Sequence, residues 1–477
     1  MVYRILAWLL RVATRVFFRQ IEVVGLEHVP ADGPVIFAGN HPNSLIDPVL
    51  IIATCGRKVH FAAKDALFRG RIMKWILGGL GAVPIKRRHD HDGGEATAAA
   101  APESVDNGAA FAAMFDVLGA GGAIGIFPEG LSHDESQLAR LKTGAARLAL
   151  GAAHRTGKDI AVVPCGLTFI HPKRFRSRVL VQYGPPLAIT CAIAETPDEV
   201  RTVTDEIGAS LRRLTVNAPD WETVRALDVV RRLYQPQEIS IEERVELARR
   251  FNTYYGAVAA DPRVAALMLR VRAYQQKLDE LGVTDRELAR DLSKLEVSAR
   301  VVRHFILLAF WLPLTLPGAP LHVPPLAFAR IASKRITPRK DVIATTKLLI
   351  GMALVLVAYA ATIAIAWWRR DLWWALAAAI ILPLSGWATL RVLDRARLVR
   401  RGLGVLARRL RFRREVASLR GERAALVADV IATVDAVKPA ELVLLFPERE
   451  AEHESSRARR DADLDDVYDR RHDDGER

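Results

Sequence analysis

Short apolar runs alternate with helical patterns between residues 33 and 190. Runs that predict strands lie at residues 34–38, 59–63, 81–85, 123–127, 160–169 and 179–183. Helical spacing of apolar residues occurs at 48–54, 65–77, 108–118, 137–154 and 197–213. Strands that alternate with helices predict an α/β layer fold. Residues 90–107, rich in Gly, Ala, Asp and Glu, predict a surface loop within it.

Two long apolar runs near the C-terminal end predict a membrane hairpin. Residues 348–368 and 372–390 carry no charge, and each reaches the roughly 20 residues that a helix needs to cross the hydrocarbon. Arg369, Arg370 and Asp371 separate them, and two Trp residues flank this turn on each side, which is typical of the headgroup zone. Two helices in the core of a soluble domain are the alternative.

The charges around the hairpin predict its orientation. Six Lys and Arg residues precede it between 330 and 347, and ten arginines follow between 391 and 414. The positive-inside rule therefore places both flanks in the cytoplasm. A third apolar stretch, 305–329, contains five prolines, which make a straight span improbable. We interpret it as re-entrant, which keeps the N-terminal part cytoplasmic; if it spans, the inference about the N-terminal part fails.

The rest of the chain completes the expected organisation. Arg4, Arg11, Arg15 and Arg19 form one basic face of an N-terminal helix, and no A-x-A-like cleavage site follows. This helix is expected to lie in the membrane surface, with a soluble amphipathic helix as the alternative. The expected parts are an interfacial helix (1–20), an α/β domain (21–215), a helical connector with helices at 239–250 and 262–281 (216–300), a membrane region (301–395), and a basic helix with a charged, disordered tail (396–477).

The excess of basic residues indicates what kind of molecule the protein binds. The 477 residues are 51% hydrophobic, with 68 Lys and Arg against 54 Asp and Glu, a net charge of +14. This excess favours an anionic partner: a phospholipid surface, a phosphorylated substrate or nucleic acid. The arginine clusters flank membrane spans, where orientation already accounts for them, so nucleic acid is not expected. Three cysteines without a CxxC pair argue against a zinc site or a disulfide framework.

The loop after the first predicted strand carries the first candidate chemistry. Asp47, before Pro48, has the form of a helix N-cap, and His41 lies six residues earlier. A contact between the two requires a compact turn, which the intervening Pro, Asn and Ser residues permit. If the contact forms, Asp47 orients the imidazole and leaves the other ring nitrogen free as a general base. A surface histidine in a capping loop is the alternative.

Three further segments also lie where a strand ends, the edge at which open α/β sheets bind ligands. Lys86 and Arg87 follow residues 81–85 and suit a phosphate monoester, although alone they would be read as solvated charges. Glu129, Gly130 and Ser132 follow residues 123–127. A hydrolase triad at residues 132–134 is rejected, because successive residues cannot align as nucleophile, base and orienter.

Two other features are not expected to perform chemistry. Residues 162–168 form a strand interrupted by Pro and Gly, which we expect to shape a pocket wall, with Cys165 as an improbable nucleophile. His89, Asp90, His91, Asp92 and Glu95 resemble metal ligands but fall in the predicted loop. We therefore expect no metal site there.

Together, these four segments resemble the motifs of the glycerolipid acyltransferase family. The motifs are HPNSLIDP (41–48), the strand ending in Lys86 and Arg87, FPEGLSHD (127–134) and the Pro-centred block, followed by Leu-Lys-x-Gly-Ala at 141–145. The first and third look like the branch with the fungal glycerol-3-phosphate/dihydroxyacetone-phosphate acyltransferases, in which five residues also separate His and Asp. The resemblance covers roughly residues 20–215 and implies a mixed sheet flanked by helices.

The resemblance implies acyl transfer from acyl-CoA or acyl-ACP to a hydroxyl of glycerol 3-phosphate. His41 would be the base and Asp47 its orienter, while Lys86, Arg87, Glu129, Gly130 and Ser132 would hold the acceptor. The residues near 163–166 would contribute to the acyl pocket. A thioester is already activated, so a base, an oxyanion site and a phosphate clamp suffice, and no cofactor beyond the co-substrate is expected. The rivals are a lysophosphatidate acyltransferase and a non-catalytic lipid-binding membrane protein.

Overall fold

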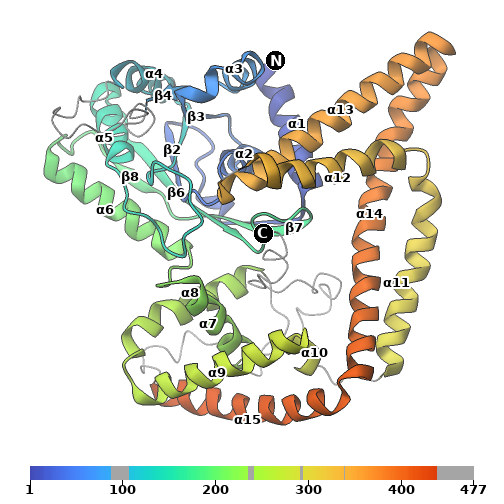
Figure 1. The fold of residues 1–477 in the computed structure, drawn as a ribbon. Helices are drawn as coiled ribbons and strands as arrows, with labels where there is room; N and C mark the ends of the chain where they lie inside the picture. Colours follow the sequence, from blue (N-terminus) through green and yellow to red (C-terminus); the bar gives the residue numbers. More distant parts are fainter. Residues whose placement is uncertain (87–106, 235–240, 290–293, 338, 438–477) are drawn as a thin grey trace, which may run out of the picture. The chain divides into compact units, whose positions relative to one another are not determined.

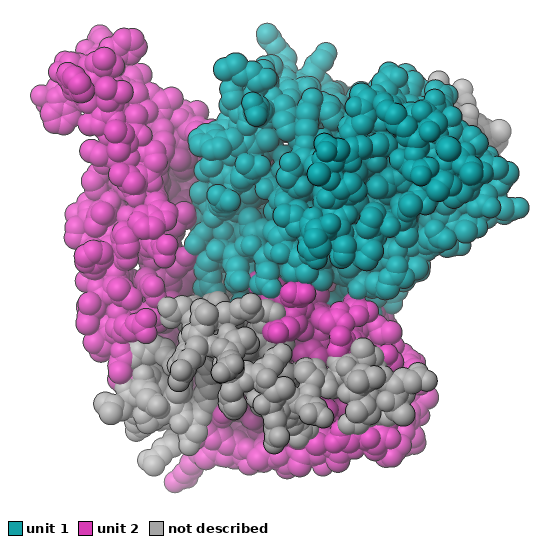
Figure 2. All heavy atoms as spheres, turned by 180° about the vertical axis from the view of Figure 1, so that it is seen from behind, with its two compact units in different colours: residues 1–217, 339–345 teal, residues 218–338, 346–477 magenta. Residues whose placement is uncertain are grey.

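The computed structural model describes residues 1–86, 107–234, 241–289, 294–337 and 339–437 (Figure 1). These residues form two compact units, coloured separately in Figure 2. The first comprises Met1–Asn217 together with the short segment Arg339–Thr345, and the second comprises Ala218–Pro338 with the residues from Thr346 onward. The surface loop expected at 90–107 lies outside the described residues except for its last residue, as does the expected tail beyond residue 437.

The first unit contains a mixed eight-stranded sheet, which confirms the predicted fold class. The strands are β1 (Phe18–Val24), β2 (Val35–Gly39), β3 (Val59–Lys64), β4 (Val83–Ile85), β5 (Ala123–Ile126), β6 (Ile160–Phe169), β7 (Ser177–Tyr183) and β8 (Leu187–Ile189). They are ordered β1-β7-β6-β2-β5-β3-β4, and β8 also pairs with β6. Strands β6, β2, β5, β3 and β4 run parallel, whereas β7 and β8 run antiparallel to β6. The parallel strands therefore end at one edge of the sheet.

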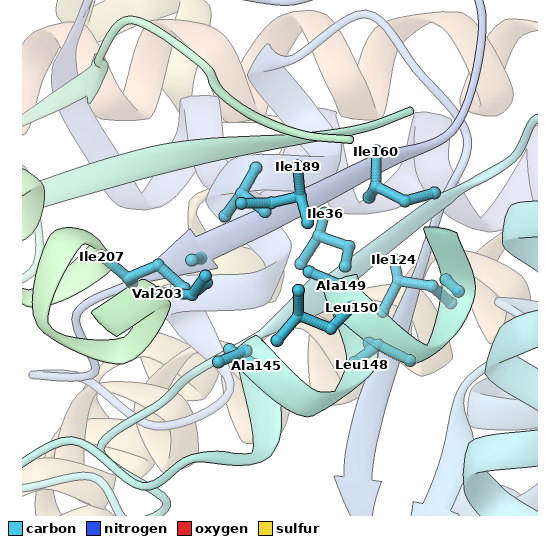
Figure 3. Packing of buried hydrophobic residues seen from close by; sticks show 14 of the residues in the cluster. Ile36, Ile124, Ala145, Leu148, Ala149, Leu150, Ile160, Ile189, Val203 and Ile207 are labelled. Carbon is cyan, nitrogen blue, oxygen red and sulfur yellow. The ribbon is translucent and has the colours of Figure 1, made fainter. Parts of the chain in front are cut away.

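Helices cover both faces of this sheet. They are α1 (Val2–Phe17), α2 (Ile46–Thr54), α3 (Arg71–Gly79), α4 (Gly108–Gly119), α5 (Gly144–Thr156) and α6 (Pro197–Leu214). Helices α4, α5 and α6 bury one face, where Ile36, Ile124 and Leu148 belong to one cluster of buried residues (Figure 3). On the other face, Phe37 packs on Tyr183 at 6.0 Å between ring centroids. The Tyr183 hydroxyl lies 2.7 Å from Thr54 Oγ1 of α2, against which α1 packs.

Three local expectations differ from the structure. The helix expected from residue 137 begins only at Gly144, because residues 137–143 carry backbone hydrogen bonds to other loops, such as Lys142 N to Pro128 O at 2.7 Å. The helix expected at 65–77 is a 3₁₀ turn (Asp65–Phe68) followed by α3, with Gly70 between them. Strands β1 and β8 were not among the predicted strands.

Strand β6 is continuous from Ile160 to Phe169, so Pro164 and Gly166 do not interrupt it as expected. The pairing explains why a proline is tolerated there. Strand β8 pairs with β6 at residues 160–162 and β7 at residues 165–169, so Pro164 lies where that side of β6 passes from one partner to the other. No ladder N–H is required at this point.

The second unit is helical throughout its described residues. Its helices are α7 (Trp221–Tyr234), α8 (Ile241–Val258), α9 (Pro262–Leu281), α10 (Asp285–Ala289), α11 (Lys294–Thr315), α12 (Ala319–Ile336), most of α13 (Ile343–Arg369), α14 (Leu372–Arg411) and α15 (Arg413–Val437). Helices α7, α9 and α15 share one apolar core, with Val229, Val271 and Val430 fully buried. The expected connector thus packs with the charged helix that was expected after Arg414 (Figure 1).

Two helices are long and apolar enough to cross a membrane, and they indicate that the chain is membrane-associated. They cover Lys340–Arg369 and Leu372–Arg408. Trp367, Trp368, Trp373 and Trp374 at their shared turn are all exposed. The helix that contains the second of these ranges, α14, runs 40 residues to Arg411, well past the expected end at residue 390, because the arginines that follow are good helix formers. The proline-rich stretch forms α11 and α12, which bend by 106° at their junction, so a straight span is excluded there.

Candidate active site

The turn from β2 to α2 brings His41 against Asp47, as the sequence predicted. His41 Nδ1 lies 2.8 Å from Asp47 Oδ2, which also accepts a hydrogen bond from the Asn43 backbone N–H at 2.7 Å. Ser44 adopts a left-handed conformation, φ +50°, which tightens the turn. The predicted capping role is wrong: α2 begins at Ile46, and the Asp47 carboxylate points back into the turn rather than capping the helix.

The burial of Asp47 defines the state of the pair. Its side chain is fully buried, and burial raises its pKa to about 6, against the opposing effect of the hydrogen bond from His41. Its second oxygen, Oδ1, has no hydrogen-bond partner among the described residues. An ionised Asp47 holds the proton of His41 on Nδ1, so the Nε2 lone pair is available to accept a proton.

An aromatic stack holds the imidazole plane. The His41 ring lies on Phe127 at 4.1 Å between centroids and 8° between planes, and Phe127 in turn stacks on Phe61 at 5.7 Å. Glycines make room for both rings: a Cβ at Gly39 would lie 3.0 Å from the Phe127 ring, and one at Gly125 would lie 2.2 Å from Phe61. The sequence analysis missed this role of Phe127, although an aromatic residue at the end of a strand next to a candidate site was a usable signal.

Glu129 joins the loops after β2 and β5. Its carboxylate is buried, and Oε1 accepts the backbone N–H of His41 at 2.8 Å. Oε2 accepts the N–H of Ala139 at 2.8 Å and is hydrogen-bonded to His133 Nε2, a bond that raises the pKa of His133. The backbone N–H of His133 also donates to the His41 carbonyl at 3.2 Å. Expected as an acceptor-binding residue, Glu129 here fixes the backbone that carries His41.

Gly130 lies at the turn after Glu129, where its φ of +75° favours glycine. A Cβ at this position would lie 2.7 Å from Nζ of Lys142. The Lys142 side chain therefore passes over the glycine turn and places a cation beside the candidate site. The Leu-Lys-x-Gly-Ala motif contained this lysine, but it was not among the predicted site residues.

Ser132 is buried, and its hydroxyl is hydrogen-bonded to Asp341 Oδ2. Arg339 Nη2 donates to the Ser132 carbonyl at 2.9 Å and to its Oγ at 3.2 Å. Both partners come from the segment Arg339–Thr345, far away in the sequence but within the first compact unit. No sequence signal connected this segment with the site.

Of the two predicted cationic residues, Lys86 is described, and it lies elsewhere along the same sheet edge. Lys86 directly follows β4 and is exposed, with its backbone hydrogen-bonded to the side chain of Asn107. Strands β5 and β3 separate β4 from β2. Arg87 lies outside the described residues, as do the histidines and carboxylates of residues 89–95. Among the residues that are described, no group of three His, Cys, Asp or Glu side chains is placed to hold a metal ion.

The fourth block forms the middle of the sheet. Val163 and Cys165 are fully buried, and burial raises the pKa of the Cys165 thiol well above its usual value, the opposite of what a nucleophile needs. Asn40, at the end of β2, bonds to both backbone groups of Leu167, with distances of 2.7 and 3.0 Å. This tie, also missed in the sequence analysis, fixes the start of the loop that carries His41.

Two family models match the chain on either side of residue 217. The model described as "Acyltransferase" matches residues 20–168, and "Glycerol-3-phosphate acyltransferase 2 C-terminal domain" matches residues 226–442. Together they cover parts of both compact units, including the C-terminal region that the sequence motifs did not reach.

Similar proteins include two yeast acyltransferases. Glycerol-3-phosphate O-acyltransferase 2 of Saccharomyces cerevisiae is 34% identical over 280 residues, covering 54% of this chain and 38% of the yeast protein. Glycerol-3-phosphate O-acyltransferase 1 of the same organism is 28% identical over 454 residues, covering 73% of this chain and 59% of the yeast protein. The chain thus spans 38% and 59% of the lengths of these two relatives.

A chloroplastic 1-acyl-sn-glycerol-3-phosphate acyltransferase of Arabidopsis thaliana is 28% identical over 151 residues, or 31% of this chain and 36% of that protein. Among solved structures, the 1-acyl-sn-glycerophosphate acyltransferase of Thermotoga maritima matches with a TM-score of 0.32 and 21% identity, over 43% of this chain and 76% of that chain.

Proposed function

We propose that the chain is a member of the glycerolipid acyltransferase family and that it transfers a fatty acyl group from acyl-CoA or acyl-ACP to a hydroxyl of glycerol 3-phosphate. One observation carries this proposal. At the carboxyl end of β2, Asp47 lies 2.8 Å from Nδ1 of His41, and among the described residues no hydrogen bond occupies His41 Nε2. This is the arrangement of an oriented general base.

The pair would act directly on the acceptor. His41 Nε2 takes the proton of the acceptor hydroxyl as its oxygen attacks the thioester carbonyl carbon. The tetrahedral intermediate collapses by breaking the carbon–sulfur bond, and the thiolate leaves with the proton that His41 received. The carboxylate of Asp47 stabilises the imidazolium between these two steps. No covalent acyl-enzyme is needed, which suits a site whose buried Cys165 has a raised pKa.

Cations would bind the phosphate of the acceptor. Lys142 beside the Gly130 turn supports this role in the structure, and Lys86 with Arg87 supports it from the sequence. Arginine forks and lysine ammonium groups are the usual partners of phosphate oxygens. Ionic partners of this kind also suit the phosphates of a CoA donor.

Membrane phospholipids would form the surroundings of the reaction. The positive-inside rule supports a cytoplasmic location for both flanks of the α13–α14 hairpin, and a re-entrant α11–α12 pair would place the catalytic unit on the same side. A cytoplasmic catalytic unit would meet a soluble donor and a product that partitions into lipid.

The test is an acceptor panel with purified, detergent-solubilised protein and labelled acyl-CoA or acyl-ACP. Glycerol 3-phosphate, dihydroxyacetone phosphate, lysophosphatidate and unphosphorylated glycerol are compared. We expect labelled lysophosphatidate from glycerol 3-phosphate and no product from glycerol. If the folded, purified protein transfers the acyl group to none of these acceptors, the non-catalytic lipid-binding alternative is favoured.

A lysophosphatidate acceptor is the second candidate. It is supported by the similarity of the chain to 1-acyl-sn-glycerol-3-phosphate acyltransferases, among them the protein of Arabidopsis thaliana, over 144 to 151 residues. The longer alignments to the two yeast proteins and the C-terminal family model favour glycerol 3-phosphate. Activity on lysophosphatidate with none on glycerol 3-phosphate would reverse this choice.

A further inference from the structure

The segment Arg339–Thr345 belongs to the catalytic unit although it follows α6 by more than 120 residues and leads directly into the membrane helix α13. Asp341 in this segment is buried, and its carboxylate is hydrogen-bonded to Ser132 of the loop after β5. Thr345 Oγ1 lies 3.5 Å from the carbonyl of Asn43 in the turn that carries His41. The segment thus touches both loops of the candidate active site.

Arg339 combines exposure with a fixed position. Its side chain is 59% exposed, but Nε and Nη2 donate to the two oxygens of Asp341 at 3.2 and 2.8 Å. Nη2 also donates to the carbonyl and hydroxyl oxygens of Ser132. Holding an exposed arginine in one geometry costs side-chain entropy. The hydrogen bonds to the buried Asp341 carboxylate and to Ser132 offset this cost. The result is a pre-oriented guanidinium at the surface of the site.

The position of Arg339 relates it to the proposed base. Ser132 precedes His133, whose backbone N–H donates to the carbonyl of His41 at 3.2 Å. Two residues before Ser132 lies Gly130, over which Lys142 passes. Arg339 and Lys142 therefore supply cations to the same loop. The contacts of Arg339 with Asp341 and Ser132 use Nε and Nη2. Among the described residues, no hydrogen bond uses Nη1, which can therefore donate to an oxyanion.

We propose that Arg339 is a further acceptor-binding residue, which donates to the phosphate of the acceptor, and that Asp341 and Ser132 are the residues that position it. This inference rests on the proposed function, because it assumes a phosphorylated acceptor. The first residues before the membrane span would then complete the phosphate site, so that the catalytic unit without them would bind its acceptor weakly. A charged hydrogen bond of this kind is worth about a tenfold or larger change in binding.

The experiment compares Arg339→Gln with Lys340→Gln in the full-length protein. Lys340 is an exposed neighbouring cation, which makes it a matched control. We expect R339Q to raise KM for glycerol 3-phosphate about tenfold or more, with a smaller change in kcat and an unchanged KM for the acyl donor, while K340Q resembles the wild type. Arg339→Lys should fall between them, because lysine retains the charge but not the fork. D341N should raise the same KM.

Other outcomes overturn the inference. If R339Q has the same kinetics as K340Q, Arg339 does not bind the acceptor. If R339Q raises only the KM for the acyl donor, Arg339 binds the phosphates of the donor instead. If R339Q does not accumulate as folded protein, R339K is judged by the same criteria.

Failure of the proposed function gives a different result. If the wild type acylates only lysophosphatidate, the same KM comparison is made with that acceptor. If the wild type transfers no acyl group, inorganic phosphate is titrated into the wild type and R339Q by calorimetry. Weaker binding to R339Q supports the phosphate site without the reaction, and equal binding rejects it.

Discussion

Both units contain buried carboxylates, and one from each unit, Asp47 and Asp285, can be compared by its partners. In the first unit, Asp47 faces the imidazole of His41 and retains one oxygen without a partner among the described residues. In the second unit, Asp285 accepts hydrogen bonds from Arg423 at 2.9 Å and from the hydroxyl of Tyr274 at 2.8 Å. The first acid is paired with an imidazole, a group that can pass on a proton, and the second with a guanidinium and a phenol hydroxyl.

This difference in partners indicates a catalytic role for Asp47 and a structural role for Asp285. A guanidinium stays protonated at physiological pH, and the contacts of Asp285 with Tyr274 and Arg423 join α9, α10 and α15. Burial of the Asp47 carboxylate costs desolvation free energy. In return, the carboxylate keeps a proton on Nδ1 of the imidazole, as in sites that perform acid–base chemistry. Variants of the two sites should therefore fail in different ways.

The largest effect is expected for His41→Ala. Removal of the base should lower kcat for acyl transfer by about 10²–10⁴-fold. Because this change also removes the side-chain partner of the buried Asp47, kcat is compared per folded molecule. Activity is measured by product formation from labelled acyl-CoA, and full activity in this variant would exclude the proposed mechanism.

Asp47→Asn should be the next most damaging to catalysis and should not weaken the fold. Loss of the carboxylate removes the orientation of Nδ1–H, and we expect kcat to fall by about 10²-fold or more. Because burial raises the pKa of Asp47, its ionisation opposes folding above about pH 6. The neutral variant should thus keep or raise the unfolding midpoint at pH 8. A large loss of stability at that pH would mean that Asp47 is primarily structural.

Asp285→Asn should show the reverse pattern. It leaves Arg423, whose side chain is only 14% exposed, without its anion. Breaking a buried pair in this way costs about 3–5 kcal/mol. The expected readout is a lower unfolding midpoint of the helical unit in denaturant, with kcat per folded molecule close to the wild type. A selective loss of kcat would show that this cluster also serves catalysis.

The smallest effect concerns pH. The carboxylate of Asp47 takes up a proton as the pH falls through about 6, so log kcat should decrease toward lower pH with a slope near one below that value. The effect of Asp47 on stability has the opposite sign. Because its pKa is raised in the folded state, the free energy of unfolding is higher at low pH, where Asp47 is protonated, than at high pH. Measurement of kcat and of the unfolding midpoint from pH 5 to 8 in one buffer series separates the two. In Asp47→Asn, the inflection near pH 6 should disappear.

The features that were predicted correctly are those with local signals. Strand β6 was located to the residue because a long apolar run was followed by turn residues. The His41–Asp47 contact was predicted because few residues separate the two and a turn-forming sequence lies between them. The capping role of Asp47 was wrong because the same carboxylate is needed inside the turn, where two donors compete for it.

The missed features depend on partners far away in the sequence. Ser132 and Asp341 are separated by 209 residues, and no periodicity or spacing connects them. Asn40 and Leu167 are joined across two adjacent strands, which required the strand order. Phe127 was recognised as part of a motif, but its stacking on His41 depends on the space left by Gly39.

The discontinuous first unit has a consequence for biosynthesis. Residues 218–338 are translated between its last helix and the segment Arg339–Thr345 that completes it. Domains generally fold as they emerge from the ribosome, N-terminal part first. The α/β domain can therefore collapse early, but its loops gain Asp341 only when the ribosome begins the first long apolar helix. The loops around His41 are thus completed only after most of the helical second unit up to Pro338 has been translated.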